Sequence, residues 1–355
     1  MKPLTFSLSA YQAYQRCEQK YDYGYRQRLR PAVKAIAPER GRILHEYLAV
    51  YYRAVAAGAE PLAAHQAGQA QIMAHAPRIK ASAAIAHYAG QEEEARTYLE
   101  LIPAVVNIAE RYFIVHGEGD ALHFEVLLVE EKMDFEIVAG IKSKSIIDLV
   151  FRDRRNDLIW LAEHKTTERV PDSSVRLRDF QTLLYANVLW REKGIHVDGV
   201  FWNYLRTKEP AKPHQNRDGR FSKAINIDTT WDIYERAIRE AGQDPGAYAD
   251  VRDRLQGREE VAFFPRYEHV ITADPDLLIH DYAVTAQRVR YQSQLWDWGV
   301  DRPVRTLNRD CTFCDYYRLC EAAIMGGDTE DILRMRFTTE PEERPVAAIE
   351  EEKPA

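Results

Sequence analysis

Asp148, Glu163 and Lys165 carry side chains suited to hydrolysing a phosphodiester, and they lie in two successive strand-like stretches. Carboxylate oxygens are the ligands that hard divalent cations prefer, and a nearby lysine can orient a water and stabilise developing negative charge. Side chains two residues apart on a strand point to one face, so Glu163 and Lys165 would act together. The backbone carbonyl of His164, between them, could be a further oxygen ligand.

An acid two residues before a lysine is a weak signal by itself. An exposed salt bridge at a sheet edge has the same spacing and contributes little energy, so it is the alternative on spacing alone. The pair at Glu163 and Lys165 differs from the others in its context. It follows a hydrophobic run of strand-forming residues, and the preceding strand carries the acid Asp148. The other pairs with this spacing are Glu18 with Lys20, Glu130 with Lys132 and Glu351 with Lys353.

Two predicted helices bring further candidates. In "DFQTLLYANVLW", Gln181 and Tyr185 are one helical turn apart and share a face. In "GRILHEYL", His45 lies at the edge of an apolar helical stripe. Each also fits a purely structural role, as a buried tyrosine with a hydrogen-bonding neighbour or as a core histidine.

Three of the four cysteines lie in "CTFCDYYRLC", at Cys311, Cys314 and Cys320, and the fourth is Cys17 near the other end of the chain. Four cysteines are too few for a disulfide scaffold, and a reducing compartment leaves thiolates free to bind metal. Four thiolates suit either tetrahedral Zn²⁺ or an iron–sulfur cluster. A shared site requires that the fold bring the two ends of the chain together.

The hydrophobic pattern predicts an α/β protein. Ser9 and Gln12 fit a capping box for an opening helix that contains Cys17, and helical spacing dominates from about 42 to 115. β-Branched and alternating runs then predict a sheet enclosed by helices. The expected strands are 123–138, 143–153, 158–167 and 197–205, helices are expected near 228–242 and 275–299, and an acidic, proline-containing tail over 338–355 is expected to be disordered.

Residues 204–224 form a predicted basic loop that contains proline and glycine. Such a loop could follow a nucleic-acid strand by phosphate contacts, with Tyr204 and Phe221 at its borders stacking on unpaired bases. A solvated surface loop is the alternative. The basic residues are Arg206, Lys208, Lys212, Arg217, Arg220 and Lys223.

The composition is that of an ordinary soluble protein, with 46% hydrophobic and 29% charged residues. No segment has the apolar length of a membrane span, and the first residues lack the order of a signal peptide, so we expect a cytoplasmic protein with no membrane partner. The net charge of −7 argues against a nonspecific nucleic-acid coat protein. It is compatible with a nuclease, whose metal-binding acids count as negative while basic residues gather locally.

These motifs together resemble the PD-(D/E)XK nuclease superfamily, and within it the RecB-like iron–sulfur branch of the AddB nuclease domain and the CRISPR-associated RecB-like exonucleases. The resemblance lies in the order of "LSAYQAYQRCEQKYDYGY", "GRILHEYL", "IIDLVF", "AEHKTT", "QTLLY" and "CTFCDYYRLC". The usual Pro-Asp dipeptide is absent because Ile147 precedes Asp148. The fold implied is a central mixed sheet flanked by helices, with a helical insertion and a C-terminal iron–sulfur segment joined to the first helix.

The resemblance also implies residue roles. Asp148, Glu163, the carbonyl of His164 and His45 would bind Mg²⁺ or Mn²⁺, and Lys165 would orient the attacking water. Gln181 and Tyr185 would support the site and contact DNA. The four cysteines would hold a structural 4Fe–4S cluster.

By the same resemblance, residues 1–337 would be one RecB-like nuclease domain. It would comprise a helical subdomain at about 42–115, a catalytic core at about 120–205 and a C-terminal part at about 226–325. The expected activity is that of a metal-dependent deoxyribonuclease, acting as an exonuclease on single-stranded DNA or DNA ends, with a helicase or recombination protein as partner. A viral, recombination, repair or CRISPR-associated role would fit. The alternative is a noncatalytic nucleic-acid-binding module with a structural metal cluster.

Overall fold

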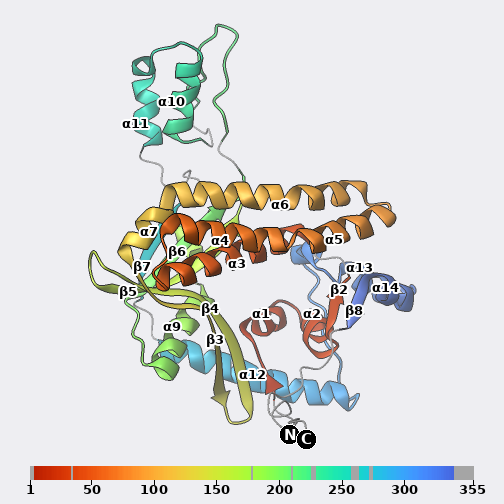
Figure 1. Ribbon diagram of the computed structural model, residues 1–355. Coiled ribbons are helices and arrows are strands. Elements are labelled where there is room, and N and C mark those ends of the chain that lie inside the picture. Colours follow the sequence, from red (N-terminus) through yellow and green to blue (C-terminus); the bar gives the residue numbers. More distant parts are fainter. Residues whose placement is uncertain are drawn as a thin grey trace, which may run out of the picture. The chain divides into compact units, whose positions relative to one another are not determined.

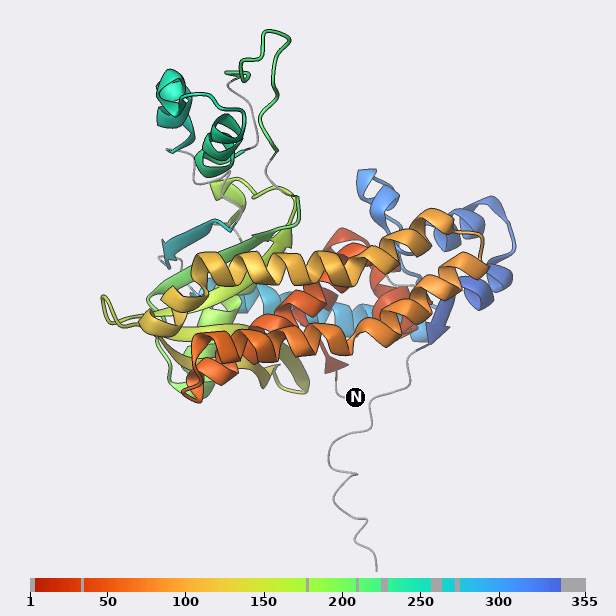
Figure 2. The same cartoon turned by 45° about the horizontal axis from the view of Figure 1, so that its top comes forward.

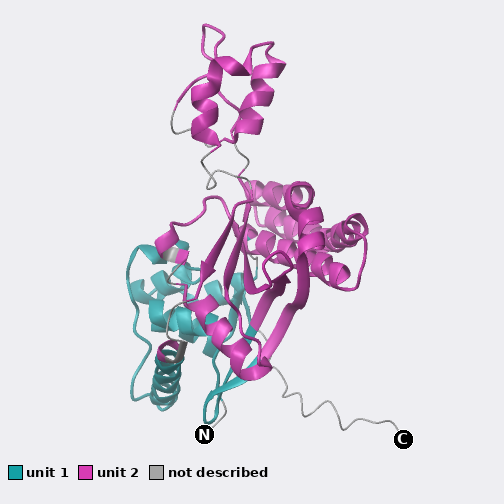
Figure 3. Ribbon diagram, turned by 90° about the vertical axis from the view of Figure 1, so that its left-hand side faces the viewer, with its two compact units in different colours: residues 1–35, 134–145, 279–355 teal, residues 36–133, 146–278 magenta. Residues whose placement is uncertain are grey.

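The chain forms two compact units in the computed structural model (Figure 3). Unit 1 comprises residues 1–35, 134–145 and 279–355, and unit 2 comprises residues 36–133 and 146–278. All the candidate metal ligands lie in unit 2, and all four cysteines lie in unit 1. The structure describes residues 4–32, 35–176, 179–208, 211–224, 229–256, 264–271 and 275–339.

A six-stranded mixed sheet is the framework of the fold (Figure 1). Along the sheet the order is β1-β4-β5-β6-β7, and β3 also pairs with β4. The β4–β5 and β6–β7 pairs are antiparallel, whereas β5–β6 and β1–β4 are parallel. This confirms the predicted α/β class. The strands are β1 (Leu4–Thr5), β3 (Phe124–Val138), β4 (Ile141–Asp153), β5 (Leu158–Thr167), β6 (Gly199–Arg206) and β7 (Arg266–Val270).

A tight hairpin joins β4 to β5 at the polar sequence predicted to be a turn. The Asp153 carboxylate accepts a hydrogen bond from the backbone N–H of Arg155 at 2.9 Å, and Asp157 has a left-handed φ of 64°. Aspartate tolerates that conformation better than most residues. The antiparallel ladder runs from Asp153 with Leu158 to Leu149 with Ala162. Asp148 and Glu163 follow immediately beyond the last pair, so the hairpin brings them next to each other.

A crossover through α8 (Ser173–Arg176) and α9 (Phe180–Lys193) links the parallel strands β5 and β6. Asp179 caps α9 by accepting hydrogen bonds from the N–H groups of Gln181 and Thr182, and Gly194 ends it with a left-handed φ of 67°. β6 is buried along its whole length, between β5 and β7. Gly199 begins this strand because a Cβ there would meet the carbonyl of His269 and the ring of Trp160.

Long helices precede the sheet in the sequence of unit 2, where the sequence predicted a helical region. α3 packs against α4, and α5 packs against α6 (Figures 1 and 2). α3 also contacts β5, and α6 contacts β6, so this layer covers the centre of the sheet. The elements are α3 (Ile36–Ala56), α4 (Pro61–Ala74), α5 (Ala76–Tyr88), α6 (Glu92–Tyr112), the π-helical turn η2 (Phe113–Gly117) and α7 (Glu118–His123).

Between β6 and β7, the chain forms a small insertion with its own apolar cluster. Its helices are α10 (Trp231–Glu240), the 3₁₀ turn η3 (Pro245–Tyr248) and α11 (Ala249–Leu255). Phe221, from the predicted basic loop, packs in this cluster with Tyr234 and Tyr248. The loop is therefore anchored to a folded element.

In unit 1, both ends of the described chain contribute to one small core. Tyr23 and Leu29 pack there with Tyr316, Leu319 and Phe337. The elements are α1 (Leu8–Arg16), α2 (Glu18–Tyr21), the π-helical turn η1 (Asp22–Arg26), β2 (Leu29–Pro31), α12 (Pro275–Asp297, in unit 1 from residue 279), the 3₁₀ turn η5 (Arg309–Phe313), α13 (Tyr317–Met325), α14 (Thr329–Arg336) and β8 (Phe337–Thr339). β2 and β8 pair antiparallel.

Three sequence predictions about the two ends of the chain need correction or stay open. The N-cap of α1 is Ser7, which accepts from the N–H of Ala10, so the proposed cap at Ser9 was wrong by two residues. Cys17 is the junction between α1 and α2, not an interior helical residue. Thr338 and Thr339 belong to β8. The rest of the predicted disordered tail, 340–355, lies outside the described residues.

Candidate active site

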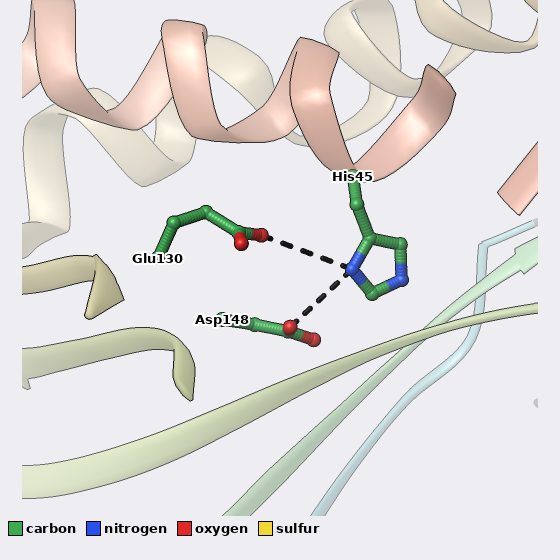
Figure 4. Close-up of side chains that lie close together, drawn as sticks. All are labelled: His45, Glu130 and Asp148. Atoms are coloured by element: carbon green, nitrogen blue, oxygen red, sulfur yellow. Dashed lines mark ion pairs between the residues drawn. The ribbon is translucent and has the colours of Figure 1, made fainter. Parts of the chain in front are cut away.

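His45, Glu130 and Asp148 converge from α3, β3 and β4 (Figure 4). The Nδ1 atom of His45 lies 3.3 Å from Asp148 Oδ1 and 3.9 Å from Glu130 Oε1. One ligand atom from each of the three residues lies within 4.8 Å of the others. An imidazole and two carboxylates at this spacing form a donor set that a divalent cation can bind.

Glu130 was missed as a site residue, because its spacing to Lys132 appeared incidental. It has a left-handed φ of 48°, which is rare for a residue other than glycine inside a strand and is typical of a β-bulge. The buried residue of the first half of β3, Phe124, has an even number, whereas the buried residues of its second half, Met133 and Phe135, have odd numbers. One inserted residue produces that change. This shift in alternation was a signal in the sequence that could have identified Glu130.

Asp148 also bonds to the next strand. The backbone N–H of His164 donates to Asp148 Oδ2 at 2.9 Å, just beyond the end of the β4–β5 ladder. The carboxylate thus accepts a bond from a strand N–H while its other oxygen contacts His45. Asp148 and His164 are both buried.

Glu163, Lys165 and Gln181 form a second group on β5 and α9. Glu163 Oε1 accepts from Lys165 Nζ at 2.5 Å and from Gln181 Nε2 at 2.9 Å. Lys165 Nζ lies 3.5 Å from Gln181 Oε1. Glu163 Oε2 is buried and has no hydrogen-bond partner among the described residues. Burying a carboxylate oxygen without a partner is unfavourable. A cation bound to this oxygen would remove that cost, so the atom is a candidate metal ligand.

The electrostatics of the site reflect several acids held together. Burial and the nearby charge of Asp148 raise the pKa of Glu163 to about 7. Burial and Asp148 likewise raise the pKa of Glu130. Burial opposes protonation of His45, but its hydrogen bond to Asp148 and the surrounding acids raise its pKa to about 9. A bound cation would relieve the repulsion that raises the acid pKa values, so the residues fit a divalent metal.

Tyr185 and His164 are the remaining predicted residues of this region. Tyr185 is buried on α9, one turn after Gln181. The ring of His164 is buried and packs against Tyr52, so only its backbone could serve the metal. The roles of Tyr185 and of the His164 carbonyl stay predictions.

Comparison with protein families decides the class of protein. The model of the PD-(D/E)XK nuclease superfamily matches residues 5–321. The chain belongs to the PD-(D/E)XK nuclease superfamily. Members of this superfamily are typically metal-dependent nucleases, and the mixed sheet with flanking helices fits their fold. A search of curated proteins found no match.

A cavity in unit 1 of this PD-(D/E)XK chain is lined by all four cysteines. Its volume is about 270 Å³. Thr306 also lines the cavity, where its N–H lies 3.5 Å from the sulfur of Cys17 and its carbonyl lies 3.7 Å from the thiol of Cys311. All four thiols are free of disulfides. The fold therefore brings Cys17 to the C-terminal cluster, across most of the sequence.

The predicted DNA-contacting residues of this superfamily member fall into two groups. Arg206 is buried in β6, where its Nε donates to the carbonyl of Glu168 at 3.4 Å, so it does not share the exposed position expected of a loop residue. Tyr204 and Phe221 are also buried, which overturns their proposed stacking on bases. The exposed residues are Lys208, Lys212, Arg217, Arg220 and Lys223, of which Lys223 pairs with Asp250 at 2.8 Å. Among the described residues, no helix is long and apolar enough to cross a membrane.

Proposed function

We propose that this PD-(D/E)XK protein is a metal-dependent deoxyribonuclease that acts as an exonuclease on single-stranded DNA or DNA ends. The observation that carries the proposal is the unpartnered, buried Oε2 of Glu163, close in the fold to Asp148 and bonded through Oε1 to Lys165. Most buried polar atoms have a hydrogen-bond partner, so an unpartnered carboxylate oxygen beside a lysine favours a cation-binding role over a purely structural ion pair.

Asp148, Glu163, His45 and the carbonyl of His164 would hold Mg²⁺ or Mn²⁺, and we add Glu130 to this set because its carboxylate joins His45 and Asp148. The cation would supply Lewis-acid stabilisation of charge on the scissile phosphate and acidify a bound water. Lys165 would orient the attacking water and stabilise negative charge with its ammonium group. Gln181 would hold the carboxylate of Glu163 in place, and Tyr185 would support the helix that carries it.

We further propose that the chain belongs to the RecB-like iron–sulfur branch and that Cys17, Cys311, Cys314 and Cys320 hold a 4Fe–4S cluster. Stoichiometric metal analysis distinguishes this cluster from tetrahedral Zn²⁺, which four thiolates also suit. The four cysteines line one cavity of about 270 Å³, and their convergence from both ends of the chain supports a shared metal centre. Its role would be to join the two ends of the chain.

The exposed basic residues of the loop after β6 would contact DNA phosphates without reading sequence. The candidates are the exposed residues Lys208, Lys212, Arg217, Arg220 and Lys223. Nothing in the sequence resembles a phosphate-cradling helicase loop, so a helicase or recombination protein would supply unwinding. A role in recombination, replication or repair, in a virus or in CRISPR adaptation would suit such a nuclease. The proposed domain organisation, a single nuclease domain over residues 1–337, fits this assignment.

Degradation of end-labelled single-stranded DNA in Mn²⁺ tests the nuclease proposal. We expect the wild-type protein to degrade the DNA and Lys165→Ala to lose about 100-fold or more of the rate, as expected when an electrostatic contact to the reacting group is removed. Lys193→Ala is the matched control, because Lys193 is a lysine on α9 whose partner is Glu131, outside the site. Binding of DNA without cleavage in any divalent cation would favour the noncatalytic module.

A further inference from the structure

A row of polar side chains crosses three adjacent strands behind the candidate metal site. His164 of β5 is paired in register with Asn203 of β6, and Asn203 is paired in register with Arg266 of β7. Cross-strand neighbours in register project from the same face of a sheet. His164 alternates with Glu163 and Lys165, so the row lies on the opposite face of β5 from these two residues.

Hydrogen bonds connect every member of the row. Asn203 Nδ2 donates to His164 Nδ1 at 2.9 Å, which fixes the ring proton of His164 on Nε2. The same amide nitrogen donates to the hydroxyl of Tyr112 at 2.8 Å. Arg266 Nε donates to Asn203 Oδ1 at 3.1 Å. The Asn203 amide thus has partners on both sides, and its orientation is fixed.

The row ends on a buried ion pair. Arg266 donates two parallel hydrogen bonds of 2.6 Å to the carboxylate of Asp120 on α7, and a further one of 2.7 Å to the hydroxyl of Tyr112. Asp120 also accepts from the hydroxyl of Tyr52 at 2.8 Å. A buried ion pair contributes little net stability compared with apolar residues of the same size. Its more characteristic effect is to fix geometry, because bidentate arginine–carboxylate bonds tolerate little rotation.

The network meets the metal-binding helix at His164. Tyr52 lies two turns after His45 on α3, and its ring stacks on the ring of His164 with a centroid separation of 5.8 Å and an angle of 4°. The ring of His45 meets that of His164 edge-on at 5.9 Å. The imidazole of His164 is therefore held from α3 on one side and from β6 on the other. Its own backbone N–H holds Asp148.

We propose that Asp120, Arg266, Asn203 and His164 form a positioning network that fixes α3 and β5 relative to each other, so that His45, Asp148 and Glu163 share one cation. The inference rests on the metal site proposed above. His164 transmits the constraint because its ring belongs to the network while its backbone belongs to the site. Asn203 contacts His164 through its ring and not through the backbone carbonyl proposed to bind the metal, and Arg266 acts through Asn203, so both are positioning residues.

Calorimetric titration of Mn²⁺ into the full-length protein tests the network. Asn203→Leu removes the bonds to His164, Tyr112 and Arg266 at nearly constant volume, and we expect Mn²⁺ affinity to fall by about 10- to 100-fold, the usual effect of losing a partner behind a metal ligand. Asn187→Leu is the matched control, because Asn187 is another buried asparagine of unit 2 and lies outside the network. Its affinity should stay within about twofold of wild type. Asp148→Asn should abolish binding.

The outcomes separate this inference from the metal site on which it rests. If Asp148→Asn abolishes binding but Asn203→Leu binds like the wild type, the network is overturned and the metal site stands. If Asn187→Leu loses as much Mn²⁺ affinity as Asn203→Leu, the proposed network is also overturned. Loss of any buried asparagine would then weaken the site by destabilising the fold in general. Unchanged binding in Asp148→Asn would overturn both. If Asn203→Leu does not fold, Arg266→Lys is titrated by the same criteria, since it keeps the charge but loses the Nε–H to Asn203.

Discussion

The backbone N–H of His164 donates a 2.9 Å hydrogen bond to Asp148 Oδ2, so one carboxylate both ends the β4–β5 ladder and forms part of the candidate metal site. Oδ1 of the same carboxylate lies 3.3 Å from His45. Structure and proposed chemistry thus depend on different properties of Asp148. The N–H requires an acceptor, whereas the cation requires a negative charge.

Two substitutions of Asp148 should therefore have different consequences. Both variants lose the charge of Asp148, but Asp148→Asn keeps an acceptor for the N–H of His164, whereas Asp148→Ala leaves this buried N–H unpaired and should be less stable than Asp148→Asn by about 1–3 kcal/mol. Both should lose Mn²⁺ binding. Urea unfolding in metal-free buffer measures the difference, and equal stability of the two variants would contradict this account of the hydrogen bond.

Glu130 and Glu131 offer a comparison between adjacent acids. Glu130→Gln should weaken Mn²⁺ binding by about 10-fold, because it removes one charged oxygen ligand from the site. Glu131→Gln should have no effect, since Glu131 pairs with Lys193 instead. Titration of Mn²⁺ into each variant checks the prediction. Equal affinities would exclude Glu130 from the ligand set.

The ion cluster at Glu39 should make stability depend on pH. Burial opposes its ionisation, but hydrogen bonds from Arg42 on its own helix and Arg78 on α5 lower the pKa of Glu39 to about 2, from 4.5. Since the folded-state pKa is depressed, the stabilisation is complete above about pH 4.5 and is lost as the pH falls towards 2.

Glu39→Gln should therefore be less stable than wild type by about 1–2 kcal/mol at pH 7, a value reduced for the partial exposure of both arginines, and the difference should vanish near pH 2. Unfolding in urea at several pH values measures it. Glu93→Gln is the control, because Glu93 and its partner Arg96 are both exposed. A difference that does not change with pH would argue against the ion cluster.

Loss of Cys17 should damage the protein as severely as loss of Cys314, although these residues lie at opposite ends of the chain. Anaerobically purified wild-type protein should be brown, absorb near ~400 nm and contain iron and sulfide, as a thiolate-held cluster does. Cys17→Ser and Cys314→Ser should each lose the iron and unfold at lower temperature. Stoichiometric zinc in the wild-type preparation would reject the iron–sulfur assignment.

The hairpin that carries the site could be predicted from the sequence, because its information is local. Alternation along 158–167 places Glu163 and Lys165 on one face, and the polar turn before it fixes the partner strand. The predicted helix with Gln181 is present, and its amide reaches Glu163. These predictions depend only on period, turn chemistry and short spacing, which are properties of a few neighbouring residues.

The parts that could not be predicted depend on contacts between distant segments. The link from Asp120 to Arg266 joins residues 146 apart in sequence. Tyr204 and Phe221 appeared to border an exposed loop but are buried, Phe221 in the core of the insertion after β6. Tertiary packing decides both. Glu130 differs, because the shift in alternation along β3 is a local signal that could have identified it from the sequence.

Cleavage and binding of one single-stranded oligonucleotide, measured in parallel for the wild type and Asp148→Asn in Mn²⁺, test the central claim most directly. We expect the wild type to cleave, and Asp148→Asn to lose about 1,000-fold or more of the rate while binding the oligonucleotide within a few fold of wild type, because the charge that holds the cation is gone and the fold is kept. Equal cleavage by both proteins would contradict the account, as would a wild type that binds the oligonucleotide and cleaves it in no divalent cation.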